Sequence, residues 1–230
     1  MDIARFIQIF VVQGLIALFF LFMAYIVLKR GRKRINLYLS SFYLSVTVGG
    51  ILNIIYANIF NETVVFVLHF ITYYLFCFSM VFLLIFVLIL IKPTDHKILK
   101  FQYLILIISG LLILGLLFIP NGIIINETTN WKPDWSVFFL IYSVIVCSSI
   151  FIIPTTYYSI KLYKKFENEY LKRKWKYFII GISAYFFIYY GTSISNTLNN
   201  DTIRLVWSII SLPTLISLYL IYYGVVQQLE

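Results

Sequence analysis

Seven long stretches of this chain contain no Asp, Glu, Lys or Arg, and every charged residue lies between or outside them. The whole chain is 62% hydrophobic and 12% charged, whereas soluble domains carry about 25% charged residues. A water-soluble fold of 230 residues has too little polar surface to cover so many apolar side chains. The charge distribution therefore predicts a protein whose main solvent is the lipid bilayer.

Each stretch is long enough for a helix that crosses a hydrocarbon core of about 30 Å, because an α-helix rises about 1.5 Å per residue. The stretches are continuously apolar rather than alternating, which argues against a β-barrel. In lipid, backbone polar groups must be satisfied internally, so helices remain. We expect an all-α integral membrane bundle of seven helices, forming a single domain over residues 1–230. The expected helices cover residues 6–28, 35–60, 64–91, 101–120, 136–160, 177–198 and 205–226.

Fifteen of the 18 Lys and Arg residues fall in alternate gaps, after the first, third and fifth stretches. Basic residues favour the cytoplasmic side, so we expect a multi-pass plasma-membrane protein with its N-terminus outside and its C-terminus in the cytoplasm. Three N-x-[ST] sequons, at Asn61, Asn126 and Asn200, lie in gaps assigned to the outside and are glycosylation candidates. The basic charge is interpreted as facing anionic lipid headgroups, and no nucleic-acid partner is expected.

Several kinds of membrane chemistry need residues that the seven stretches lack. Proton pumps and ion-coupled transporters normally need an ionisable group within the membrane, and intramembrane aspartyl proteases need paired aspartates. The last stretch has no lysine that could bind retinal, and the chain has no His-Glu-x-x-His or P-loop motif. The two histidines, His69 and His96, fall towards opposite membrane faces. We therefore expect no enzymatic activity, no metal and no cofactor.

Neutral polar residues gather instead in the outer third of the expected bundle, where Gln13, Asn53 and His69 lie at similar depth. Such side chains can orient a small ligand in a mostly apolar pocket that opens outwards. They can equally form hydrogen bonds between helices, which contribute about 0.6 kcal/mol each. The candidate ligand-binding residues are Gln13, Asn53, His69, Tyr142, Tyr189, Ser193 and Trp207.

Two prolines interrupt expected helices, Pro154 in the fifth and Pro213 in the seventh. A proline inside a helix removes a backbone hydrogen bond and usually kinks the helix. Kinks occur where receptors and transporters bend, and they are also ordinary features of membrane helices. We interpret both prolines as candidate hinges.

Five features follow one another in a fixed order along the chain: the basic cluster at 29–34, Lys92-Pro93-Thr94 after the third helix, the stretch 135–165 from an outer tryptophan to Tyr163-Lys164-Lys165, Lys172-Arg173-Lys174, and the final helix from Leu212-Pro213-Thr214 to Gly224. Their order resembles the seven-transmembrane N-terminal sensor region of microbial histidine kinases and related signalling receptors. The resemblance is one of layout and extends over nearly the whole chain. It implies an extracellular or membrane-borne signal and a cytoplasmic output module after the last helix.

We therefore expect a membrane sensor or receptor domain that binds a small, mostly apolar ligand between its helices and signals to a cytoplasmic kinase or other output protein. Membrane lipids are the other expected partner. Two alternatives stay open: a facilitative carrier or channel for small or lipidic solutes, and a structural subunit of a membrane complex. A carrier would need a polar path to the inner face, for which Ser40, Ser41, Thr155 and Thr156 are candidates.

Overall fold

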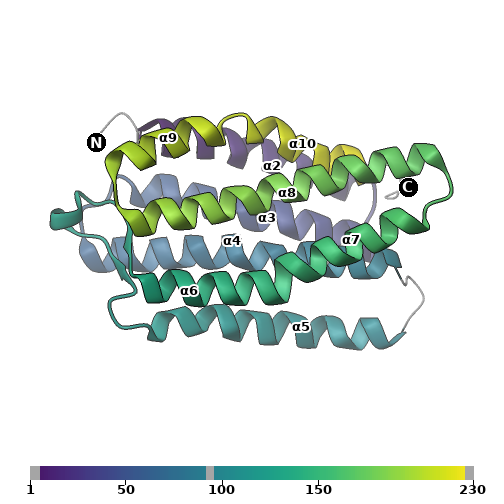
Figure 1. Cartoon of the computed structure of the whole chain (residues 1–230), viewed down its shortest axis with the longest axis horizontal. Helices are drawn as coiled ribbons and strands as arrows, with labels where there is room; N and C mark the ends of the chain where they lie inside the picture. Colours follow the sequence, from purple (N-terminus) through teal and green to yellow (C-terminus); the bar gives the residue numbers. More distant parts are fainter. Residues whose placement is uncertain (1–5, 92–95, 226–230) are drawn as a thin grey trace.

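The computed structural model describes residues 6–91 and 96–225, which form an elongated bundle of helices (Figure 1). The all-α fold expected from the sequence is confirmed. Lys92-Pro93-Thr94 and the last residue of the expected final helix, at 226, lie outside the described residues. The elements are the π-helix η1 (Ile7–Gln13), α2 (Gly14–Lys29), α3 (Arg34–Tyr56), α4 (Glu62–Ile91), α5 (His96–Leu114), the 3-10 turn η2 (Gly115–Phe118), β1 (Ile123–Ile124), the 3-10 turn η3 (Glu127–Thr129), β2 (Asp134–Trp135), α6 (Val137–Val146), the π-helix η4 (Cys147–Ile152), α7 (Ile153–Lys165), α8 (Glu169–Leu198), α9 (Asp201–Ser211) and α10 (Thr214–Val225).

The connections between the helices lie at the two ends of the bundle (Figure 1). At one end, called the hairpin end, β1 pairs antiparallel with β2, and Ile123 lies opposite Trp135. The α3–α4 and α8–α9 connections lie at the same end. At the other end, called the basic end, lie the α2–α3 and α7–α8 connections with their lysines and arginines. The short hairpin within 121–135 was not expected from the sequence.

Within the described residues, six helices are long and apolar enough to cross a membrane. The bent pair α9–α10 makes a seventh if it is counted as one span. The outer surface of the bundle carries many large apolar side chains; Leu18 is 68% exposed and Phe138 is 78% exposed. Soluble proteins rarely expose apolar surface on this scale. The structure therefore fits a multi-pass membrane protein.

The helices do not end where the uncharged stretches end. α8 begins at Glu169 rather than at 177, because the Asn168 side chain accepts hydrogen bonds from the backbone N–H groups of Tyr170 (2.8 Å) and Leu171 (3.3 Å) and so caps the helix. α7 likewise continues through basic residues to Lys165. A charge-free stretch marks the length suited to lipid, whereas caps decide where a helix starts.

The three sequon asparagines all begin helical segments at the hairpin end. Each side-chain oxygen accepts a hydrogen bond from a backbone N–H in the first turn, and asparagine is among the preferred residues for this role. Capping accounts for these asparagines structurally, and their glycosylation stays a prediction. The bonds run from Val64 N to Asn61 Oδ1 (3.1 Å), from Thr128 N to Asn126 Oδ1 (3.0 Å) and from Thr202 N to Asn200 Oδ1 (2.9 Å).

Both prolines lie where a helix is interrupted. Pro154 lies in the first turn of α7, directly after the π-helix η4, and the path from α6 to α7 changes direction there (Figure 1). Pro213 is exposed and separates α9 from α10, whose axes are bent by 40°. The final helix expected over 205–226 is therefore two helices, because a proline cannot supply the N–H that would continue α9.

α8 and α10 cross with their backbones in close approach, which two glycines allow. A Cβ atom added at Gly181 would lie 2.6 Å from the Ile221 nitrogen, and one added at Gly224 would lie 2.8 Å from the Lys174 carbonyl oxygen. Neither contact leaves room for a methyl group. α10 is therefore packed tightly on α8, whereas α9 lies beyond the Pro213 break.

We expect Gly181→Ala to destabilise the bundle by about 1–3 kcal/mol, because the new methyl group must push α10 away from α8. Gly14→Ala is the matched control, since its nearest neighbour would lie 3.9 Å away and alanine favours a helix interior by about 0.5–1 kcal/mol. Unfolding of the purified variants in mixed micelles, followed by circular dichroism, measures both. Equal stability of the two variants would contradict the close crossing.

Candidate functional site

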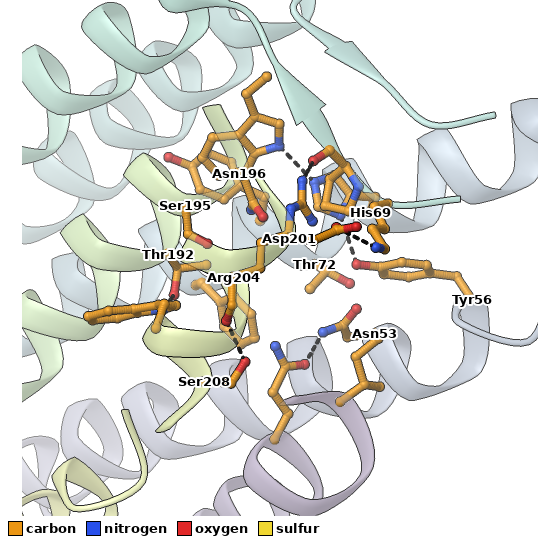
Figure 2. Close-up of a pocket in the computed structure, with 18 residues that line it drawn as sticks. Asn53, Tyr56, His69, Thr72, Thr192, Ser195, Asn196, Asp201, Arg204 and Ser208 are labelled. Atoms are coloured by element: carbon orange, nitrogen blue, oxygen red, sulfur yellow. Dashed lines mark hydrogen bonds and ion pairs between the residues drawn. The ribbon is translucent and has the colours of Figure 1, made fainter. Parts of the chain in front are cut away.

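A cavity of about 130 Å³ lies between the helices at the hairpin end. Its lining comes from η1, α3, α4, α8, α9 and the segment around β2 (Figure 2). Four of the seven residues proposed from the sequence line it: Gln13, Asn53, His69 and Trp207. These four residues, which were chosen because they lie at similar depth along their helices, therefore line one cavity.

Asn53 on α3 and Gln13 on η1 both line the cavity, and their side chains are hydrogen-bonded to each other. The Asn53 Nδ2 group donates a hydrogen bond to Gln13 Oε1. Asn53 is 5% exposed, and its other polar atom, Oδ1, has no hydrogen-bond partner among residues 6–91 and 96–225. A buried acceptor without a donor costs about 1–3 kcal/mol. This oxygen can be satisfied by a donor on a molecule in the cavity.

Thr72 on α4 supplies a second buried polar atom of the same kind. Its side chain is 3% exposed and lines the cavity, and within the described part of the chain its hydroxyl has no hydrogen-bond partner. Figure 2 shows Thr72 between Asn53 and Arg204 in the view into the cavity. Thr72 was not among the residues predicted from the sequence. Its position three residues after His69, on the same face of a helix, is the signal that points to it.

His69 is fixed by two neighbours rather than left open to a ligand. The Trp135 Nε1–H group donates to His69 Nε2 (3.2 Å), and Tyr56 Oη lies 2.8 Å from His69 Nδ1. An indole N–H can only donate, so Nε2 is the unprotonated nitrogen, and Nδ1–H of the neutral ring donates to the tyrosine oxygen. His69 therefore connects α3, α4 and β2 of the hairpin, and it presents only its ring to the cavity.

α8 and α9 form the wall opposite His69. The Trp207 Nε1–H group donates to Thr192 Oγ1 (3.1 Å), and the indole ring lies against Gly191, where any side chain would clash with it. Ser208, the next residue of α9, also lines the cavity, and its hydroxyl donates to the Arg204 carbonyl oxygen (2.8 Å). Since α9 contributes four of the lining residues, a shift of this helix changes the shape of the cavity.

A second cavity, of about 90 Å³, lies next to the first and shares Gln13, Tyr73, Phe76 and Thr192 with it. Two more of the proposed residues, Tyr189 and Ser193, line this second cavity. It extends towards the middle of the bundle, where most of its lining is apolar. Its other apolar residues include Val12, Ile16, Val46, Met80, Ile188 and Leu218.

A chain of hydroxyl groups joins α4, α6 and α8 beside the second cavity. The Ser143 Oγ atom is hydrogen-bonded to Tyr73 Oη and, at 2.6 Å, to Tyr189 Oη. The remaining proposed residue, Tyr142, lines neither cavity. Its hydroxyl donates to the Leu112 carbonyl oxygen (2.9 Å) and faces α5. Tyr142 was expected beside the ligand because of its depth, but its direction around the helix axis turns it to the opposite side.

Three charged side chains lie at the mouth of the first cavity, and from the sequence alone they indicate only the topology. The Lys132 ammonium group pairs with the Asp201 carboxylate at 2.6 Å. The Arg204 guanidinium donates to the Pro133 carbonyl oxygen (2.6 Å) and to Asn199 Oδ1 (3.0 Å). These contacts hold the segment directly before β2 beside α9.

Comparison of the chain with protein-family models, curated proteins and solved structures finds no match. Over residues 6–91 and 96–225, the structure brings together no group of three or more His, Cys, Asp or Glu side chains that could hold a metal ion. The function therefore has to be argued from the two cavities themselves.

We expect His69→Phe to destabilise the protein by about 1–3 kcal/mol, because it removes the acceptor for the buried Trp135 N–H while keeping an aromatic ring. Backbone amides over 131–136 should also exchange hydrogen faster, since this segment loses its bond to α4. Asn58→Ala is the control, because Asn58 is exposed and its effect should stay within about 0.5 kcal/mol. Indistinguishable unfolding curves for the two variants would refute the bridging role of His69.

Proposed function

We propose that this chain is a seven-span plasma-membrane receptor, with the hairpin end outside and the basic end in the cytoplasm. Fifteen of its 18 Lys and Arg residues belong to gaps after odd-numbered spans, and cytoplasmic loops are enriched in these residues. The bent pair α9–α10 serves as the seventh span in this arrangement. The cavity then opens towards the outside, where it can receive an external or membrane-borne signal.

The observation that carries the receptor proposal is the pair of unsatisfied polar atoms, Asn53 Oδ1 and Thr72 Oγ1, facing one cavity. Other buried polar atoms of the described residues, such as Tyr43 Oη, Ser109 Oγ and Thr155 Oγ1, also lack a hydrogen-bond partner, and this pair differs from them because both of its residues line the cavity. A small ligand that is largely apolar, with a few polar groups, can satisfy them while filling the apolar cavity below. Binding energy is thus available from both hydrogen bonding and apolar burial. A closed structural subunit would need no such cavity.

A carrier is the runner-up, and the packing below the cavities favours a receptor over it. Tyr43, Phe86, Trp175 and Phe178 are completely buried towards the basic end, and the Trp175 and Phe178 rings stack at 4.4 Å. Ser40, a candidate for a polar path, is directed to the Ala24 carbonyl oxygen instead. Solute flux through the protein in proteoliposomes would favour the carrier, and ligand binding without flux would favour the receptor.

The break at Pro213 gives the receptor a means of passing on the binding event. α9 forms a wall of the cavity, whereas α10 is packed on α8 through Gly181 and Gly224. A ligand that moves α9 changes the angle at Pro213 and so applies force to the α8–α10 pair, which reaches the basic end. A cytoplasmic kinase or other output protein would respond there. The bend at Pro154 between η4 and α7 is the second candidate hinge.

Removing the Thr72 hydroxyl should separate stability from binding. We expect Thr72→Val to make the ligand-free protein more stable, by about 1–3 kcal/mol, because an unsatisfied buried hydroxyl is lost. Thr192→Val is the matched control in the same cavity. It should be destabilising, since Thr192 Oγ1 accepts the Trp207 N–H. Unfolding in mixed micelles measures both, and destabilisation by both substitutions would show that Thr72 has a structural partner rather than a ligand.

The orientation can be tested with single cysteines, since the native Cys77 and Cys147 are buried and serve as the unlabelled background. Asn58→Cys, at the hairpin end, should react with a membrane-impermeant maleimide on intact cells, because positive-inside orientation places that end outside. Arg173→Cys, at the basic end, should react only after the membrane is permeabilised. The reverse labelling pattern would overturn the proposed orientation.

A further inference from the structure

The two cavities are adjacent, and they offer different groups to a molecule that fills both. The first cavity contains Asn53 Oδ1 and Thr72 Oγ1, which have no hydrogen-bond partner in the described part of the chain (Figure 2). Such a molecule therefore meets two unsatisfied polar atoms at one end. It then passes into the second cavity among the residues that line both, which are Gln13, Tyr73, Phe76 and Thr192.

The tyrosine and serine side chains of the second cavity are already hydrogen-bonded within the protein. The Tyr189 hydroxyl is paired with Ser143 Oγ at 2.6 Å, and the Tyr185 hydroxyl is paired with Ser79 Oγ at 2.7 Å. Ser193 Oγ donates to the Tyr189 carbonyl oxygen (2.8 Å). A polar group on the ligand would lose its contacts with water here and gain little in exchange. The second cavity therefore favours an alkyl chain without further polar groups.

The size of the second cavity favours a narrow chain. At about 90 Å³ it is smaller than the engineered cavity of about 150 Å³ that takes up benzene. An unbranched alkyl chain needs less width than a ring or a branched chain. The part of the ligand that enters this cavity is therefore an unbranched alkyl chain.

The charged side chains at the mouth are engaged with other groups of the protein. Lys132 pairs with the Asp201 carboxylate at 2.6 Å, and the Arg204 guanidinium donates to two oxygen atoms of the chain. A charged head group on the ligand would have to displace one of these contacts. The polar end of the ligand is therefore selected by Asn53 and Thr72 rather than by the charges, and it is uncharged.

A single hydroxyl group matches the two unsatisfied atoms. The amide oxygen of Asn53 can only accept a hydrogen bond, so the ligand must supply a donor there. The Thr72 hydroxyl can donate, so the ligand must also supply an acceptor. An alcohol does both with one oxygen atom, since its O–H donates to Asn53 while its lone pair accepts the Thr72 proton.

We infer that the two cavities together bind an uncharged primary alcohol with an unbranched alkyl chain. Its hydroxyl group pairs with Asn53 and Thr72, and its chain extends into the second cavity. This inference rests on the proposed receptor function and specifies the ligand class of the same site. It involves no covalent step, because the ligand is held by two hydrogen bonds and by apolar burial.

Two photoreactive forms of octan-1-ol test the position of the ligand. One carries a diazirine at carbon 3, near the hydroxyl group, and the other carries it at carbon 7, near the end of the chain. Each is photolysed with the full chain in zwitterionic nanodiscs, and the adducts are located by mass spectrometry. We expect the carbon-3 probe to label first-cavity residues such as Phe76, and the carbon-7 probe to label Met80 and Leu218 in the second cavity.

Displacement of these probes by two isomers tests the hydroxyl group. Octan-1-ol and methyl heptyl ether contain the same atoms, but the ether has no O–H to donate to Asn53. Their concentrations are compared after their partition into the nanodiscs has been measured. We expect the alcohol to displace the probes at a concentration at least about tenfold lower, which corresponds to about 1.4 kcal/mol. Equal displacement by the two isomers would overturn the role of the hydroxyl donor.

Thr72→Val tests the second hydrogen bond and should weaken binding of octan-1-ol by about fivefold or more. Thr155→Val is the matched control, because the Thr155 hydroxyl is also buried without a partner in the described part of the chain but lines neither cavity. Its affinity for octan-1-ol should equal that of the unmodified chain. An equal loss in both variants would refute the assignment of Thr72. If Thr72→Val does not fold, the comparison of the two isomers in the unmodified chain still decides the question.

A series of alcohols from butan-1-ol to dodecan-1-ol tests the second cavity. Each CH₂ group buried there should increase affinity about fourfold, and the increase should stop once the chain fills the cavity. Partition into lipid continues to rise with chain length, so a plateau in affinity distinguishes the cavity from the membrane. An increase through the whole series would show that the chain lies in lipid, and it would overturn the placement of the tail.

Failure of the ligand class can be told apart from failure of the receptor proposal. Displacement of the probes by octanoate or octylamine at lower concentrations than octan-1-ol would overturn the uncharged head and leave the binding site standing. Labelling that octan-1-ol does not displace would overturn the ligand class, since the two polar atoms would then be hydrated only. The receptor proposal has its own measurement, the hydrogen exchange of backbone amides over 169–176 at the basic end. Saturation with octan-1-ol should change that exchange at least about twofold; binding without any change would overturn the receptor and leave the ligand class intact.

Discussion

Buried polar atoms in an apolar bundle must find hydrogen-bond partners, and this requirement shapes the whole molecule. An unsatisfied buried atom costs about 1–3 kcal/mol, and membrane helices have few other polar groups with which to respond. His69 meets the requirement between Tyr56 and Trp135 and thereby joins two helices to the hairpin segment. Asn53 Oδ1 and Thr72 Oγ1 do not meet it within the described residues, and both face the same cavity. The same requirement thus accounts for the His69 bridge and, because these two unsatisfied atoms share one cavity, for the choice of the candidate site.

The sequence predicts the helices and the depth of the polar residues well, and it predicts their direction poorly. Charge-free length and continuous hydrophobicity are properties of each segment alone, so the all-α fold follows from them. Depth along a helix can also be counted, which is why Gln13 and Asn53 are found together. Direction around the helix axis depends on packing against neighbours, since these segments are apolar on all sides. Tyr142 therefore faces α5 although its depth is suitable, and Thr72 escaped notice.

The charges at the mouth illustrate a second limit, that of sequence distance. Lys132 and Arg204 lie in different gaps between the helices. From the sequence alone, they contribute only to the number of basic residues on one side of the membrane. The tertiary structure pairs Lys132 with Asp201 and places Arg204 against the Pro133 carbonyl oxygen. Only the tertiary structure shows that these charged residues lie together beside one cavity. The same holds for α9 and α10. Pro213 predicts a break between them, but the different ways in which they pack on α8 depend on contacts of Gly181, Gly224 and Trp207 that the sequence does not show.

The capping asparagines have a consequence for how this protein is handled in the laboratory. Asn→Gln is the usual substitution for removing a sequon, but at Asn61 and Asn200 it would also take away the first hydrogen bonds of α4 and α9. Loss of surface expression after such a change would then report a frayed helix start rather than a missing glycan. Replacing the sequon threonines instead, with Thr63→Ala and Thr202→Ala, abolishes the acceptor sequence and keeps the asparagine caps in place.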